Sequence, residues 1–114
     1  MNKIDIIIDA CEDVKGQDIK NISLEGKSSI ADNFIITSAN TVNQTKAIAR
    51  RIDEKMAEAG FHETYKEGYR EGSWIVLDYI DVVVHIFTSD LREFYNLEKL
   101  WSDAPLENIE AWID

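Results

Sequence analysis

The chain has 114 residues, 45% apolar and 30% charged, a balance typical of a single folded domain and not of a disordered chain. Its 22 acidic and 12 basic residues give a formal net charge of −10. This charge argues against binding to a nucleic-acid backbone and favours a basic partner, although acidity that serves only solubility explains it equally well.

The single cysteine, Cys11, excludes an internal disulfide and fits a reducing compartment. The N-terminus, MNKIDIIIDACEDV, lacks the apolar core of a signal peptide, and no apolar run is long enough for a membrane span. We therefore expect a cytoplasmic protein with no membrane partner.

The first predicted element is an amphipathic helix over residues 4–14 that ends near Gly16. Cys11 lies on its apolar stripe, so we interpret this thiol as a packed side chain and not as a nucleophile.

The alternation of residues 18–25 slips once, which predicts an edge strand or a bulge. Residues 26–29 are a predicted turn, and the β-branched run over residues 33–38 predicts a central strand.

Residues 42–59 have the clearest helical periodicity of the chain. Thr41 and Gln44 predict a capping box at its start, and Gly60 is a natural C-terminal stop. We interpret its basic residues as a solvated helix face and not as a binding site.

A weak strand is predicted over residues 64–69, followed by a hairpin of residues 74–79 and 82–88. The hairpin tip would be Ile80-Asp81, which predicts strain or a longer loop because isoleucine resists positive φ. Residues 90–101 predict short helical turns.

Together these elements predict an α/β (α+β) fold, a mixed β-sheet with helices mainly on one face. A crossover helix at residues 42–59 favours one parallel strand pair. We expect one domain over residues 1–105 and an acidic C-terminal tail over residues 106–114, either docked or dependent on a partner.

Pairing the hairpin strands across the tip separates two faces. One face is apolar and predicts the core; it carries Ile75, Leu77, Tyr79, Val82, Val84 and Ile86. The other pairs Trp74 with Phe87, Val76 with His85 and Asp78 with Val83. Aromatic anchors beside a few polar groups predict a binding surface. Two alternatives are a second layer that covers this face and a homodimer of the free protein that buries it.

The sequence offers no support for catalysis or metal binding by His85. The only other histidine is His62, and no P-loop, nucleophile elbow or dinucleotide-binding motif is present. We therefore expect a protein that is not an enzyme, with no catalytic residues, no metal and no cofactor.

From Gly72 the sequence reads GSWIVLDYIDVVVHIFTSDLREFYNLEKLWSDAP, which resembles the signature of the ribosomal silencing factor family, also called the Iojap family. The stretches GQDIKNISLEGKSSIADNFIITSANT and KAIARRIDEKM are similar to this family as well. The resemblance extends from about residue 2 to residue 105, and the order of its motifs is specific.

The resemblance implies a translational repressor that binds ribosomal protein uL14 of the large subunit. Binding there sterically blocks association of the small and large subunits, especially when nutrients are short. Members are cytoplasmic in bacteria, with relatives in mitochondria and plastids, and no nucleic-acid specificity of their own is expected. Their fold is similar to that of nucleotidyltransferases.

Carried over by position, the resemblance implies contact residues in the hairpin and in a C-terminal motif. With Phe87 added from the strand pattern, the expected partner-binding residues are Trp74, Asp78, Asp81, His85, Phe87, Tyr95, Leu97, Glu98 and Trp101. Members commonly have glycine where Ile80 stands, which leaves the tip geometry open.

The alternative is a degenerate nucleotidyltransferase with residual nucleotide binding. Nucleotidyltransferases hold Mg²⁺ with two carboxylates two residues apart, after a Gly-Ser turn. Gly26, Ser28 and Asp32 echo this pattern, but Phe34 stands where the second carboxylate is needed. We therefore expect a nucleotidyltransferase-like topology without its catalytic residues.

Overall fold

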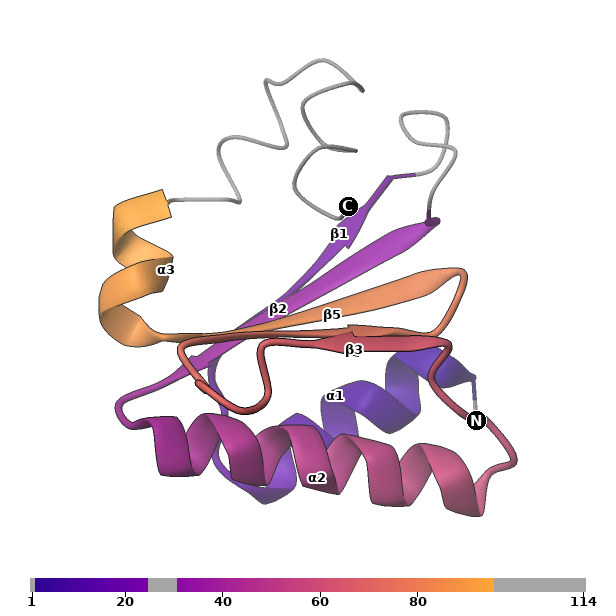
Figure 1. The fold of residues 1–114 in the computed structure, drawn as a ribbon. Coiled ribbons are helices and arrows are strands. Elements are labelled where there is room, and N and C mark those ends of the chain that lie inside the picture. The colour runs from indigo at the N-terminus through magenta and orange to yellow at the C-terminus, as the bar shows by residue number, and fades with distance from the viewer. Residues whose placement is uncertain (1, 25–30, 96–114) are drawn as a thin grey trace.

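A computed structural model describes residues 2–24 and 31–95, with the backbone alone for residues 93–95. It contains a five-stranded sheet in the order β1-β2-β5-β4-β3 (Figure 1). The elements are α1 (Lys3–Asp13), β1 (Gln17–Ser23), β2 (Asn33–Ala39), α2 (Val42–Glu58), β3 (Tyr65–Glu67), β4 (Trp74–Asp78), β5 (Val82–Thr88) and α3 (Ser89–Tyr95). The predicted turn at 26–29 and the tail at 106–114 lie outside the described residues.

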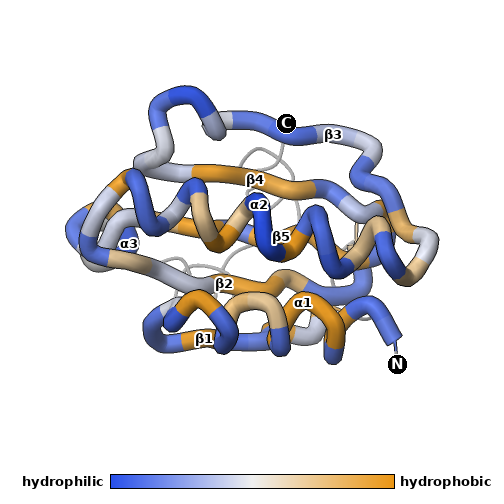
Figure 2. The backbone as a smooth tube through the Cα atoms, turned by 90° about the horizontal axis from the view of Figure 1, so that it is seen from below, coloured by the Kyte–Doolittle hydropathy of each residue, from blue (hydrophilic) through white to orange (hydrophobic). Residues whose placement is uncertain are grey.

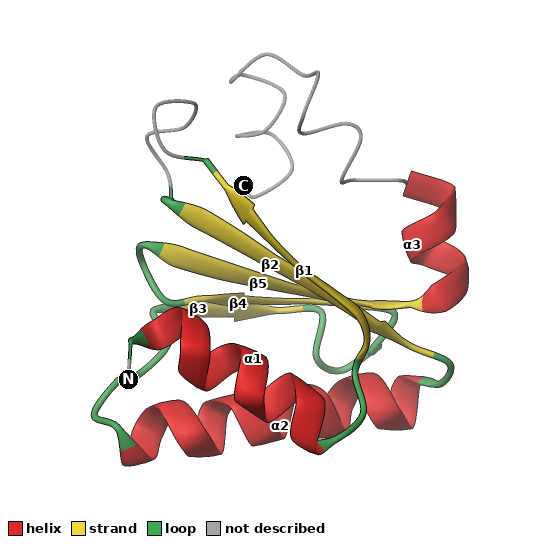
Figure 3. Ribbon diagram, turned by 180° about the vertical axis from the view of Figure 1, so that it is seen from behind, coloured by secondary structure: helices red, strands yellow, loops and turns green. Residues whose placement is uncertain are grey.

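The sheet is mixed, as predicted. β2 and β5 are parallel and are connected through the crossover helix α2, whereas β1, β4 and β3 pair antiparallel with their neighbours. Helices α1 and α2 lie side by side on one face of the sheet (Figures 1 and 3). The predicted mixed sheet with helices mainly on one face is confirmed.

The hairpin register is also confirmed. Ile75 pairs with Ile86 and Leu77 with Val84, and the N–H of Tyr79 donates to the carbonyl of Val82 at 2.9 Å. The apolar positions of both strands therefore share the face that α1 and α2 cover.

The predicted edge strand carries the predicted bulge. β1 is at one end of the strand order, and its register with β2 shifts between Gln17 and Lys20. Asp18 lies inside this irregularity with φ 50°. The buried Arg92 of α3 donates to the carbonyl of Gln17 at 3.3 Å, so the bulge also anchors α3.

Only half of the predicted capping box forms at α2. The hydroxyl of Thr41 accepts from the N–H of Gln44 at 3.2 Å, as expected. The amide of Gln44 does not return to Thr41; it donates to the carbonyl of Val14 at 3.0 Å. The side chain therefore connects the start of α2 to the end of α1, a tertiary use that local sequence does not reveal.

Two basic residues on the predicted solvated face of α2 form ion pairs with α1 and stay partly exposed. The carboxylate of Asp13 accepts from Arg51 at 3.2 Å and also pairs with Lys55. These partners lower the pKa of Asp13, through hydrogen bonds from Lys55 first and Arg51 second. Exposed ion pairs of this kind contribute little stability individually.

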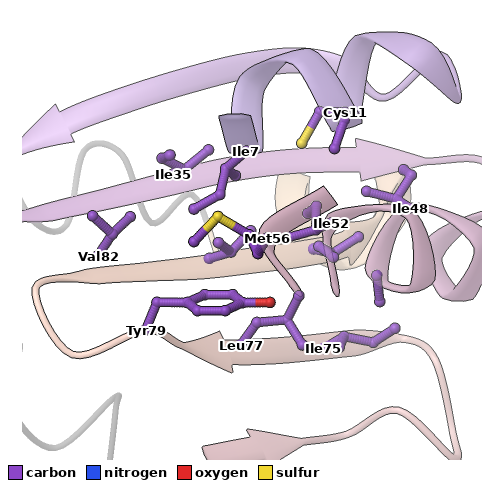
Figure 4. Packing of buried hydrophobic residues seen from close by; sticks show 14 of the residues in the cluster. Ile7, Cys11, Ile35, Ile48, Ile52, Met56, Ile75, Leu77, Tyr79 and Val82 are labelled. Atoms are coloured by element: carbon purple, nitrogen blue, oxygen red, sulfur yellow. The ribbon is translucent and has the colours of Figure 1, made fainter. Parts of the chain in front are cut away.

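The main core lies between the sheet and the two long helices (Figure 4). Cys11 is fully buried there, and burial raises the pKa of its thiol to about 12. The interpretation of Cys11 as a packed thiol is confirmed. The buried residues that Figure 4 labels in this core are Ile7, Cys11, Ile35, Ile48, Ile52, Met56, Ile75, Leu77, Tyr79 and Val82.

A second hydrophobic cluster occupies the opposite face of the sheet. Its buried members are Leu24, Ala31, Phe34, Ile36, Val76, Val83 and Phe87, with Ile22, Trp74 and Leu91 partly buried against them. Leu91 comes from α3, and Leu24 and Ala31 flank the connection between β1 and β2. The prediction that this face is exposed is therefore wrong: the alternative of a covering layer is correct.

No helix within residues 2–24 and 31–95 is long and apolar enough to cross a membrane.

The hairpin tip is strained, as its sequence predicts. Ile80 has φ 78° and is 64% exposed. The N–H of Asp81 donates to the carbonyl of Tyr79 at 3.1 Å, which is the i to i+2 bond of a γ-turn centred on Ile80. Isoleucine at positive φ is unfavourable because its branched Cβ crowds the backbone.

Replacing Ile80 with glycine should stabilise the protein by about 1 kcal/mol. Glycine removes a strain at Cβ of about 1–2 kcal/mol, but it also raises the backbone entropy of the unfolded chain, which offsets part of the gain. Urea denaturation followed by circular dichroism measures this change. Ile80→Ala is the matched control, because it shortens the same exposed side chain but keeps the Cβ. Equal stabilisation by both variants would show that strain at φ is not the cause.

Candidate functional site

Three of the predicted contact residues meet in one aromatic group on the face opposite the long helices. The rings of Trp74 and Phe87 stack with centroids 5.1 Å apart, and the ring of His85 meets Phe34 edge-on at 5.1 Å. The strand pairing predicted from the sequence placed Trp74, His85 and Phe87 on one face correctly. It did not include Phe34, which lies on β2.

His85 is a buried structural residue in this group. It is fully buried, and burial lowers the pKa of its imidazole to about 3. Its Nδ1 accepts a hydrogen bond from Nε1 of Trp74 at 3.1 Å, which requires a neutral ring. Together with the full burial of Phe87, this corrects the expectation that both side chains are displayed on the surface.

Trp74 is only partly buried, so it is the aromatic residue of the hairpin that a partner can still contact. The same side chain packs on Phe87 and donates to His85. Truncating Trp74 would therefore disturb the second cluster as well as any contact, and it makes a poor test residue for binding.

Asp78 and Asp81 lie at the hairpin tip and have structural partners. The carboxylate of Asp78 accepts from the N–H of Ile80 at 2.8 Å. Asp81 forms an ion pair with Lys3 at 2.7 Å, and this hydrogen bond lowers the pKa of Asp81. Asp81 keeps half of its side chain exposed, and Asp78 is partly exposed, so both are accessible to a partner.

The C-terminal part of the predicted site is largely outside the described residues. Tyr95 is the last residue of α3, where only the backbone is described. Leu97, Glu98 and Trp101 lie beyond it. Their assignment stays a prediction.

Sequence reasoning missed a polar network between α2, β3 and the end of β4. The hydroxyl of Tyr79 donates to Asp53 at 2.6 Å, and the ammonium of Lys66 contacts Asp53 at 2.6 Å and Glu63 at 3.1 Å. Burial and the neighbouring Asp53 raise the pKa of Glu63 to about 7. Burial acts against ionisation of Asp53 too, but hydrogen bonds from Glu63, Lys66 and Tyr79 lower its pKa. Of the two carboxyl groups, Glu63 is therefore the one that holds its proton more tightly.

The short strand β3 was recognised only weakly in the sequence. Tyr65 pairs with Asp78, and Glu67 pairs with Val76, so both side chains lie on the face opposite the long helices. Lys66 lies between them and points to α2. Both outward residues are exposed. The alternation of Tyr65 and Glu67 was the available signal, but three residues are too few for a clear period.

The residues that echo a nucleotidyltransferase site do not form one in the described part. Asp32 is exposed, and its backbone N–H donates to the carbonyl of Asp81. Phe34 is fully buried in the second cluster. Within the described residues, no group of three or more His, Cys, Asp or Glu side chains could hold a metal ion.

Replacing Glu63 with glutamine should remove the loss of stability that Glu63 contributes as pH rises from about 4.5 to 7. Folding raises the pKa of this carboxyl, so between pH 4.5 and 7 the native state binds the proton more tightly than the unfolded state does. The free energy of unfolding therefore falls as pH rises through this range. Buried neutral His85 acts in the opposite direction below its ordinary pKa of 6.5, so the test is the difference between native protein and variant.

Urea denaturation between pH 4 and 8.5 measures that difference, with exposed Glu58→Gln on α2 as the control. The assignment fails if the difference between native protein and Glu63→Gln does not change with pH, or if Glu58→Gln shows the same change.

Comparison with known proteins identifies relatives along nearly the whole chain. Residues 1–113 match the family model described as "Ribosomal silencing factor during starvation". Ribosomal silencing factor of Bacillus subtilis is 45% identical over 101 residues, covering 89% of this chain and 86% of that protein. The chloroplast Iojap protein of Zea mays is 33% identical over 99 residues, which cover 86% of this chain and 43% of that longer protein.

Solved structures agree with this assignment. A crystal structure of a Chromobacterium violaceum protein has a TM-score of 0.84 and 33% identity, and covers 91% of this chain and 89% of its own. A Bacillus halodurans structure has a TM-score of 0.79 and 36% identity, and covers 86% of this chain and 91% of its own. The relatives are named as silencing factors and not as enzymes. The chain belongs to the ribosomal silencing factor family, whose members silence ribosomes during starvation.

Proposed function

We propose that this protein represses translation by binding ribosomal protein uL14 on the large subunit and sterically blocking association with the small subunit. Membership of the ribosomal silencing factor family is the observation that carries this proposal. The proposed activity is binding, so it needs no catalytic group, metal or cofactor, and its place of action is the bacterial cytoplasm.

The charge of the chain supports a basic ribosomal partner. A net charge of −10 accelerates encounter with a positively charged surface and disfavours direct contact with ribosomal RNA. The fold measures 33 × 31 × 22 Å, large enough for a bound copy to prevent two ribosomal surfaces from meeting. A steric mechanism therefore needs only affinity and the correct position.

Some of the expected contact residues are accessible to uL14 and others are not. His85 and Phe87 are buried, so their role is to support the sheet. Asp78 and Asp81 have accessible carboxylates at the hairpin tip, and Trp74 has part of its ring exposed. An exposed aromatic face was the reason to consider a homodimer, and the burial of that face within one chain removes that reason.

The purified protein should co-sediment with isolated large subunits in a sucrose gradient at moderate salt. When small subunits are added, the protein should lower the amount of joined ribosomes and raise the amounts of free small and large subunits. Subunits prepared with a variant of uL14 that carries charge reversals on its intersubunit face should lose this effect.

Isolated small subunits are the control and should not retain the protein. Absence of the protein from the large-subunit fraction, or unchanged subunit joining despite binding, would contradict the proposed function.

A further inference from the structure

Two exposed apolar residues lie on either side of Asp78, Tyr65 on strand β3 and Ile80 at the hairpin tip. Within the described residues, the large hydrophobic side chains that remain exposed are Val42 at 39%, Tyr65 at 49% and Ile80 at 64%. Val42 begins α2, on the helix side of the sheet. Tyr65 and Ile80 both adjoin Asp78: Tyr65 is its cross-strand partner, and the N–H of Ile80 donates to its carboxylate.

Two acidic residues adjoin Tyr65. Glu67 is exposed on the same face of β3 as Tyr65, and its carboxylate accepts from the Tyr65 hydroxyl at 3.1 Å. Asp78 adds a second partly exposed carboxylate. We name Tyr65, Glu67 and Asp78 the edge surface. In Figure 2, β3 is mainly hydrophilic at the edge of the sheet, next to the hydrophobic β4.

Two contacts hold β3 in place, so the edge surface is presented in a fixed orientation. Lys66, between Tyr65 and Glu67, turns the other way and binds Asp53 of α2. Gly68 follows with φ 80°, and a Cβ there would lie 1.9 Å from the carbonyl oxygen of Trp74. Only glycine allows this close approach. A pre-ordered contact surface loses little conformational entropy on binding.

The chemistry of the edge surface defines its partner. A half-exposed tyrosine ring is a common anchor at protein interfaces, and neighbouring carboxylates select lysine and arginine. β3 has a strand neighbour on one side only in the described sheet, so no described strand blocks approach from the edge. A basic protein surface with a shallow apolar depression for the tyrosine ring fits these features.

We infer that the edge surface is the part of this protein that contacts its basic ribosomal protein partner, with Tyr65 as the anchor and Glu67 and Asp78 as the charge-selecting groups. This inference rests on the proposed function and adds β3 to the contact, a strand that the family motif in the sequence does not include.

The inference is tested by titrating large ribosomal subunits with fluorescently labelled variants. Tyr65→Ala should weaken binding about tenfold, while Tyr65→Phe, which keeps the ring, should bind within about threefold of the native protein. Glu67→Lys should weaken binding and flatten its salt dependence, because a selecting charge is reversed. Both residues are exposed, so the core stays intact, which thermal unfolding of each variant verifies.

Matched controls lie on the helix side of the sheet. Val42→Ala shortens another exposed apolar side chain, and Glu54→Lys makes the same charge change at a side chain that is 62% exposed. Both should bind like the native protein. The inference about the edge surface is wrong if Tyr65→Ala and Glu67→Lys bind like the native protein, or if the controls lose as much affinity. Either result leaves the proposed function unaffected. Failure of the native protein to bind overturns both.

Discussion

The register of β5 between its two neighbours determines the rest of this structure. Every residue of β5 is buried, and alternate side chains enter different clusters. Val84 and Ile86 face the long helices, whereas Val83 and Phe87 face the second cluster. A slip by one residue would exchange the two sets and place His85 in the main core, so pairing with β2 and β4 must be unique.

Burial on both faces of the central strands leaves the accessible surface near the hairpin at the edge of the sheet. Within the described residues, the centre of the sheet offers no accessible binding face, because His85 and Phe87 are fully buried. What remains accessible near the hairpin is its tip, part of Trp74, and the adjoining edge strand β3, where Tyr65 and Glu67 face outward. The proposed steric mechanism needs no cleft, only a folded body that binds at the correct position.

The register of the hairpin was predictable from the sequence, although its first strand ends one residue earlier than predicted. The exposure of its second face was not predictable. The period of two and the two-residue tip fix which side chains share a face, and the unfavourable φ of Ile80 follows from the same register. Exposure depends on how other segments pack: Leu91, in the helix α3 that directly follows β5, and Leu24, far earlier in the chain after β1, belong to the cluster that buries the aromatic group. Their sequences carry no sign of this destination. The role of Gln44 was not predictable for the same reason. Its side chain donates to the carbonyl of Val14 at the end of α1 and does not complete the capping box.

The central claim is that this protein meets uL14 through the β3 edge, and site-specific photo-cross-linking tests it most directly. A benzophenone side chain placed at position 65 should cross-link to uL14 when the protein is bound to large subunits, as identified by mass spectrometry. The same group at position 54 on α2, exposed but on the helix side, should not. Cross-links from position 65 to a different ribosomal protein, or to uL14 from position 54 alone, would contradict the account.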